Sequence, residues 1–75
     1  MKVRYKLNNK EFTIDTPSLD SVDSLIHYII NSIKENAMKE EITLNKETLE
    51  YLYSLVAIEI CKDAYSEEID LGEIQ

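Results

Sequence analysis

The chain has 75 residues, enough for one small domain, and its 8 Lys and Arg against 15 Asp and Glu give a formal net charge of −7. So acidic a chain, with a sequence pI near 4.5, is disfavoured as a nucleic-acid-binding domain, which normally carries a basic surface. A chain of this length buries only about 60% of its unfolded surface, which leaves few core residues for a deep catalytic cleft. We therefore expect no enzyme activity.

The sequence offers no covalent or metal support for so small a fold. Cys61 is the single cysteine, so an internal disulfide is impossible, and no Cys/His cluster suggests a structural zinc site. The first 15 residues alternate charged and apolar types, which is unlike a signal peptide, and no apolar run approaches the roughly 20 residues that span a bilayer. We expect a cytoplasmic protein whose small fold is stabilised by self-association or by a protein partner.

Residues 2–7 and 10–15 alternate with period two around Asn8-Asn9, a pair that tolerates the positive φ angles of a type I′ turn. This pattern predicts a β-hairpin. Its register places Tyr5 opposite Phe12 and Val3 opposite Ile14 on one face, with Lys6 opposite Glu11 and Lys2 opposite Asp15 on the other.

A first helix is predicted after the hairpin, with Thr16 as its N-cap and Pro17 as its first residue, or with Ser18 or Asp20 as its N-cap instead; helical periodicity extends over residues 19–37. At 100° per residue, its apolar side chains fall on one arc, which we expect to be buried. They are Leu19, Val22, Leu25, Ile26, Ile29, Ile30, Ile33 and Ala37.

Residues 40–44 can add a third strand, since Ile42 and Leu44 alternate with polar neighbours. A second helix follows from about residue 46 to 65, capped by Asn45 or Thr43, with Glu47 near the positive end of its dipole. One stripe of this helix is expected to face the core: Leu49, Leu52, Tyr53, Val56, Ile60 and Ala64.

A second apolar stripe lies on the opposite side of the second helix and consists of Tyr51, Leu55, Ile58 and Tyr65, interrupted by Lys62 and edged by Glu47. A helix that is apolar on nearly all sides is normally buried on nearly all sides. So small a chain has little material to cover both stripes. We expect Tyr51, Leu55, Ile58, Lys62 and Tyr65 to form a protein interface, with burial in the core as the alternative.

Residues 66–75 form an acidic tail within the single domain of residues 1–75. Ile69, Leu71 and Ile74 are spaced along it, so it can be a short edge strand, a docked extended segment or a flexible end. The expected architecture is thus α+β, a hairpin packed on two helices in the order β-β-α-(β)-α.

No residue pattern indicates a catalytic, cofactor or metal site. His27 has Asp20, Asp23 and Asn31 along its helix but no further ligands, so we expect a solvated helix face. Cys61 has Glu59 and Asp63 nearby, which oppose a thiolate, and we expect a buried, inert thiol. The paired carboxylates Glu40-Glu41 and Glu67-Glu68 lie near element ends, and a chain with one glycine, Gly72, has no phosphate-binding loop.

Charge is unevenly distributed, and it supports two alternative functions. The basic hairpin residues Lys2, Arg4, Lys6 and Lys10 would serve a small DNA-associated regulator. An acidic patch would serve a small inhibitor or nucleic-acid mimic, of the kind that phages and mobile elements encode, in the basic groove of a target enzyme. That patch consists of Glu59, Asp63, Glu67, Glu68, Asp70 and Glu73.

The opening, a basic alternating strand, a tight turn and a second strand that runs into TIDTPSLDSVDSLIHYI, resembles the first half of β-grasp (ubiquitin-like) proteins over residues 1–37. The resemblance is one of topology. The second half departs from that family with a long helix, and the Gly-Gly terminus of conjugated modifiers is missing, so a modifier function does not carry over. The function expected first is therefore a non-catalytic interaction module that homodimerises, without a membrane or nucleic-acid partner.

Overall fold

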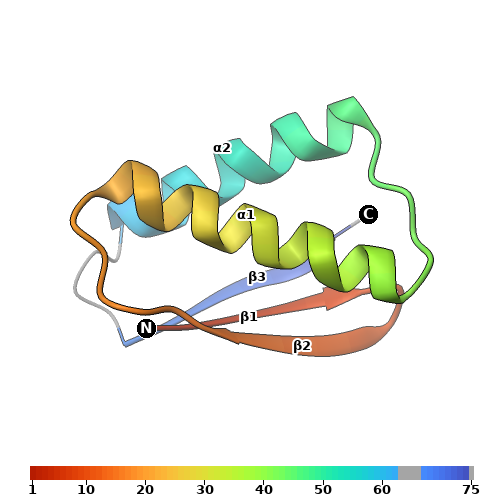
Figure 1. Ribbon diagram of the computed structural model, residues 1–75, viewed down its shortest axis with the longest axis horizontal. Coiled ribbons are helices and arrows are strands. Elements are labelled where there is room, and N and C mark those ends of the chain that lie inside the picture. Colours follow the sequence, from red (N-terminus) through yellow and green to blue (C-terminus); the bar gives the residue numbers. More distant parts are fainter. Residues whose placement is uncertain (63–66, 75) are drawn as a thin grey trace.

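The computed structural model describes residues 1–62 and 67–74, which form a three-stranded sheet with two helices on one of its faces (Figure 1). The α+β class is as predicted. The elements follow in the order β1 (Lys2–Leu7), β2 (Lys10–Asp15), α1 (Val22–Lys39), α2 (Lys46–Lys62) and β3 (Glu68–Ile74). The sheet order is β2-β1-β3, so the first strand lies in the centre.

The hairpin forms in the predicted register. Tyr5 pairs with Phe12 and Val3 pairs with Ile14 in the antiparallel ladder of β1 and β2. Asn8 and Asn9 have φ angles of 54° and 65°, as a type I′ turn requires. The inward-facing residues of β1 are all buried, and its outward residues are all exposed.

The third strand comes from the acidic tail, where the edge-strand alternative is the one observed. β3 runs parallel to β1 and turns Ile69, Leu71 and Ile74 into the core. The possible strand at residues 40–44 does not form, and β3 pairs with β1 as the third strand. Instead, residues 42–45 connect the two helices as irregular chain, with Ile42 and Leu44 half-buried against the core.

Helix α1 begins later than predicted, since its N-cap is Ser21, whose Oγ accepts a hydrogen bond from the Ser24 backbone N–H at 3.1 Å. Thr16, Ser18 and Asp20 are therefore not the cap. Thr16 instead donates hydrogen bonds from its backbone N–H and its hydroxyl to the Met1 carbonyl oxygen, which extends the hairpin. Pro17 consequently lies in the connection.

The later start of α1 leaves part of the predicted apolar arc outside the core. Leu19 precedes the helix and is 39% exposed, while Val22 opens it and is 51% exposed. Leu25 and Ile26 are half-buried, and full burial begins one turn further on. The buried residues of α1 are Ile29, Ile30, Ile33 and Ala37. The hairpin and helix that the β-grasp resemblance implies are thus present, followed by a second helix and one strand.

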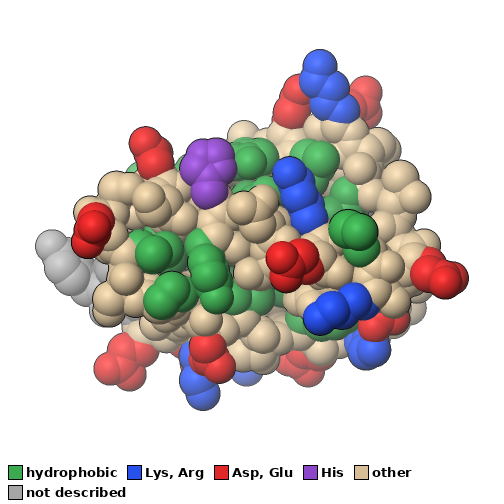
Figure 2. Space-filling view, viewed as in Figure 1, with side chains coloured by type: hydrophobic (Ala, Val, Ile, Leu, Met, Phe, Trp, Pro, Cys, Tyr) green, Lys and Arg blue, Asp and Glu red, His purple; other side chains and the backbone are tan. Residues whose placement is uncertain are grey.

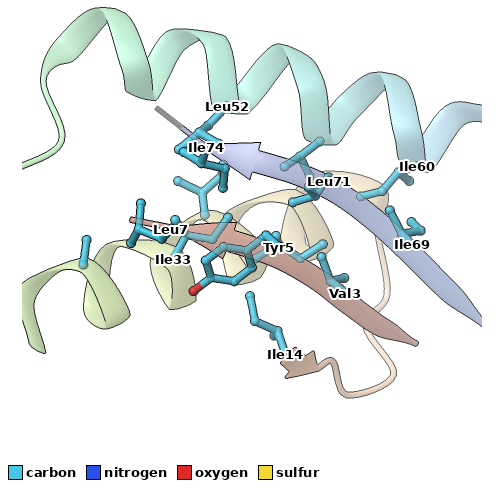
Figure 3. Packing of buried hydrophobic residues seen from close by; sticks show 14 residues of the cluster. Val3, Tyr5, Leu7, Ile14, Ile33, Leu52, Ile60, Ile69, Leu71 and Ile74 are labelled. Atoms are coloured by element: carbon cyan, nitrogen blue, oxygen red, sulfur yellow. The ribbon is translucent and has the colours of Figure 1, made fainter. Parts of the chain in front are cut away.

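The core lies between the sheet and the helices, and Tyr5 is near its middle (Figure 3). The Tyr5 ring stacks on Phe12 with ring centroids 5.3 Å apart. α2 begins after Asn45, whose Oδ1 accepts a hydrogen bond from the Thr48 N–H at 2.8 Å, as predicted for that cap. Its buried residues are Leu52, Val56 and Ile60, all from the predicted core stripe, of which Ala64 lies outside the described residues.

Candidate protein interface on α2

The face of α2 that points away from the sheet carries two large exposed apolar side chains. Tyr51 is 57% exposed and Ile58 is 52% exposed, and they lie two turns apart on the same side of the helix. Leu52, Val56 and Ile60 are buried in the core on the other side of the helix, where Figure 3 shows Leu52 and Ile60 beside β3. An α-helix cannot turn both of its apolar sides to one sheet, so this second side remains uncovered.

The other predicted interface residues flank these two. Lys62 is exposed at the end of α2, while Leu55 is half-buried and packs against the core. Tyr65 lies outside the described residues. We call Tyr51, Leu55, Ile58 and Lys62 the outer stripe of α2. Sequence reasoning did not foresee that Leu55 would divide its surface between the core and the exterior.

Cys61 is exposed, which corrects the prediction of a buried thiol. It follows Ile60, the last buried residue of α2, and the helical step of about 100° turns its side chain away from the sheet. Together with Ala57, Ile58 and Lys62 it lines a shallow hollow of about 370 Å³ beside the outer stripe. The hollow is therefore part of the same apolar surface.

A second exposed apolar surface lies over the N-terminal half of α1, on the face shown in Figure 2. In this part of the chain Leu19, Val22 and Tyr28 are the exposed large apolar side chains, at 39%, 51% and 39%. Sequence reasoning missed this surface because it placed Leu19 and Val22 in the buried arc. Two of the three side chains lie at or before the first turn of α1, ahead of Ile29, the first buried residue of the helix.

His27 is exposed, as expected for a solvated helix face, but it also contacts α2. Its Nδ1 lies 3.4 Å from the Tyr53 hydroxyl oxygen, and the two rings meet edge to face with centroids 5.7 Å apart. Within the described residues, no group of three or more His, Cys, Asp and Glu could hold a metal ion. The geometry of His27 is that of a contact between helices.

The outer face of the sheet places basic and acidic side chains side by side. Lys2, Arg4 and Lys6 project from the central strand, and the neighbouring strands place acids opposite them. Arg4 Nε lies 2.9 Å from a carboxylate oxygen of Glu68. The flanking acids are Glu11 and Asp15 on β2 and Glu68, Asp70 and Glu73 on β3.

The predicted acidic patch is therefore divided. Glu68, Asp70 and Glu73 belong to this mixed sheet face, with Glu67 exposed next to it, whereas Glu59 is half-buried on α2 and Asp63 lies outside the described residues. The basic patch is divided as well. Lys10 lies opposite the inward-facing Leu7 in the ladder and forms an ion pair with Glu40 at the end of α1, so it does not belong to the outer face. Glu40 and Glu41 thus lie at the C-terminus of α1, where Glu40 forms the ion pair; they are not a desolvated carboxylate pair.

A further hollow of about 410 Å³ opens at the hairpin-turn end of the sheet, between the turn, residues 42–45 and the end of β3. Its lining is mixed polar and apolar and includes Thr43, Thr48 and Glu73, but neither a histidine nor a cysteine. We assign no chemistry to it.

No family model, curated protein or solved structure matches the chain. Neither described helix has the length and apolar character needed to cross a membrane.

Proposed function

We propose that this protein is a non-catalytic interaction module that homodimerises through the outer stripe of α2. One observation carries the proposal: Tyr51 and Ile58 together expose more than half of their large apolar side chains on one helix face. Large apolar side chains exposed on one face mark protein interaction sites, and tyrosine is enriched in them. The adjoining hollow at Ala57 and Cys61 extends the apolar area.

A second copy of the chain is a suitable partner because α2 carries little of the net charge. Lys46 and Lys62 oppose Glu47, Glu50 and Glu59, so the described helix has a formal charge of −1, from two lysines minus three glutamates, against −7 for the whole chain. Like-charge repulsion between two copies is therefore small at the exposed apolar side of α2. A cytoplasmic setting, favoured by the single cysteine, is part of this proposal.

The alternative functions rest on charged surfaces, and the fold gives them less support. The basic residues of β1 stand between acidic residues of both neighbouring strands, so they present no continuous positive surface to a nucleic acid. The acids of β3 are interleaved with the same cations, and Glu59 is on a different element. Neither charge forms the uninterrupted row that these functions need.

The test is the mass of the protein in solution, measured by light scattering and sedimentation over a range of concentrations. We expect twice the chain mass of 8.7 kDa. The variant Tyr51→Glu/Ile58→Glu should be a folded monomer, since both side chains are exposed in the single chain. Leu55 stays unchanged, because it also packs against the core.

Val22→Glu is the matched control, since Val22 is 51% exposed, close to the 52% of Ile58, but lies on the surface of α1. It should leave the dimer intact. A wild-type protein that stays monomeric up to millimolar concentration would refute the proposal. A dimer that Val22→Glu dissociates and the α2 variant does not would place the interface on α1 instead.

A further inference from the structure

We infer that the two copies pack α2 against α2 in antiparallel orientation about a two-fold axis, with Glu47 of each copy facing Lys62 of the other. The inference rests on the proposed homodimer and adds its geometry. Both residues are exposed, Glu47 in the first turn of α2 and Lys62 in the last. Between them lies the outer stripe.

The exposed face of α2 has a symmetric spacing. Counted from the midpoint between Ser54 and Leu55, Tyr51 and Ile58 lie at equal distances on either side. Glu47 and Lys62 lie at equal distances further out. A second α2 that is turned end over end about this midpoint therefore sets Tyr51 against Ile58 of the other copy, and Ser54 against its Leu55. The small Ser54 side chain at the centre allows the two helices to approach closely.

Charge decides the direction of packing. In the antiparallel pair, each end of the interface joins one glutamate to one lysine, and the symmetry forms this contact twice. In a parallel pair in register, Glu47 would face Glu47 and Lys62 would face Lys62, so both ends would repel. The same helix face therefore attracts its own copy in one direction only.

The length of α2 suits such an interface. Its 17 residues extend about 25 Å at 1.5 Å per residue, most of the 32 Å longest dimension of the molecule. The paired residues from Glu47 to Lys62 cover nearly the whole helix. A contact along this line can therefore bury both exposed apolar side chains of both copies together.

Charge reversal provides the first test, with the dimer dissociation constant measured by sedimentation. Glu47→Lys and Lys62→Glu should each raise this constant about tenfold, because each replaces two attractive contacts by two repulsive ones. The double variant Glu47→Lys/Lys62→Glu should return the constant toward the wild-type value. Glu50→Lys, on an exposed residue away from the paired positions, is the matched control and should raise it less than either reversal.

Single cysteines test the direction independently, in a Cys61→Ser background. Ser54→Cys should form an intermolecular disulfide readily, because Ser54 lies next to the two-fold axis. Tyr51→Cys should not, since the two copies of residue 51 are separated by seven residue rises, about 10 Å along the helix pair, beyond the reach of a disulfide. A mixture of Tyr51→Cys and Ile58→Cys chains should cross-link to each other.

The outcomes separate the inference from the proposal on which it rests. A monomeric wild-type protein would refute both. A dimer that Tyr51→Glu/Ile58→Glu dissociates, but whose charge reversals have no effect and whose Tyr51→Cys variant cross-links to itself, would keep the α2 interface and overturn the antiparallel geometry. Rescue by the double charge reversal together with selective cross-linking through residue 54 would establish it.

Discussion

The hydroxyl oxygen of Tyr5 accepts a hydrogen bond of 2.6 Å from the side-chain amide of Asn36. This bond joins the central strand of the sheet to α1 at the edge of the core. Tyr5 is almost fully buried, at 1% exposure, and its ring also stacks on Phe12. One side chain thus links β1, β2 and α1.

Tyr5 makes stability depend on pH in the alkaline range. Burial raises the pKa of the Tyr5 phenol above its ordinary value of 10.0, and the hydrogen bond from Asn36 offsets part of the rise. The unfolded chain therefore releases this proton first, so the free energy of unfolding falls as the pH rises past 10.0. Urea denaturation between about pH 8 and pH 11 should show this decline, and Tyr5→Phe should make it shallower. An unchanged slope in the variant would contradict the assignment.

Neighbouring residues of β1 should differ sharply in their tolerance to substitution. Tyr5→Lys places a charge in the core and should cost about 3 kcal/mol or more. Arg4→Thr removes an ion pair whose side chains are 45% and 51% exposed, and such a pair contributes only about 0–1 kcal/mol. Chemical denaturation of both variants checks the prediction. Equal losses would show that the two faces of β1 are assigned wrongly.

The Asn45 cap should contribute measurably to α2. Asn45→Ala removes the acceptor for the Thr48 N–H and should lower the free energy of unfolding by about 1 kcal/mol. Asn45→Asp is the matched control, because it keeps the acceptor and adds a negative charge at the positive end of the helix dipole. If Asn45→Ala leaves the thermal midpoint unchanged, the side chain does not cap the helix in solution.

Gly72 should be required for its backbone conformation and not for lack of space. Its φ angle is +72°, and a Cβ built there would meet nothing within 4 Å. Gly72→Ala should therefore cost about 1–2 kcal/mol through left-handed backbone strain alone. Gly72→Asn should cost less, since asparagine tolerates this region. Equal losses from the two variants would point to a steric cause instead.

The elements with regular periodicity could be predicted from the sequence. The hairpin register followed from strict alternation on both sides of Asn8-Asn9, and the buried face of α2 followed from the spacing of Leu52, Val56 and Ile60. The start of α1 could not be chosen, because Thr16, Ser18, Asp20 and Ser21 offer similar capping oxygens; the tertiary contact with Met1 that engages Thr16 is not visible in the local sequence.

β3 was harder to predict because its alternation breaks. Ile69 and Leu71 are two residues apart, but the next buried residue is Ile74, and the register shift in the pairing with β1 lies between them. Which side of α2 faces the sheet, and therefore which side is the candidate interface, depends on the position of β3. Helical periodicity defines the sides of α2 but not which of them the sheet, with β3 in place, covers; Cys61 was therefore wrongly expected to be buried, and the choice between core and interface for Leu55 stayed open.

The parallel pairing of β1 with β3 governs the order in which the molecule can fold. Val3 pairs with Ile69, although β2, α1 and α2 lie between the two residues in the sequence. Contacts between residues so far apart in sequence form slowly. The hairpin needs only the short turn at Asn8-Asn9 and can form early. Until β3 pairs with it, β1 has one open edge that can pair with another chain. The partly folded state in which β1 has not yet paired with β3 is therefore the one most prone to aggregation.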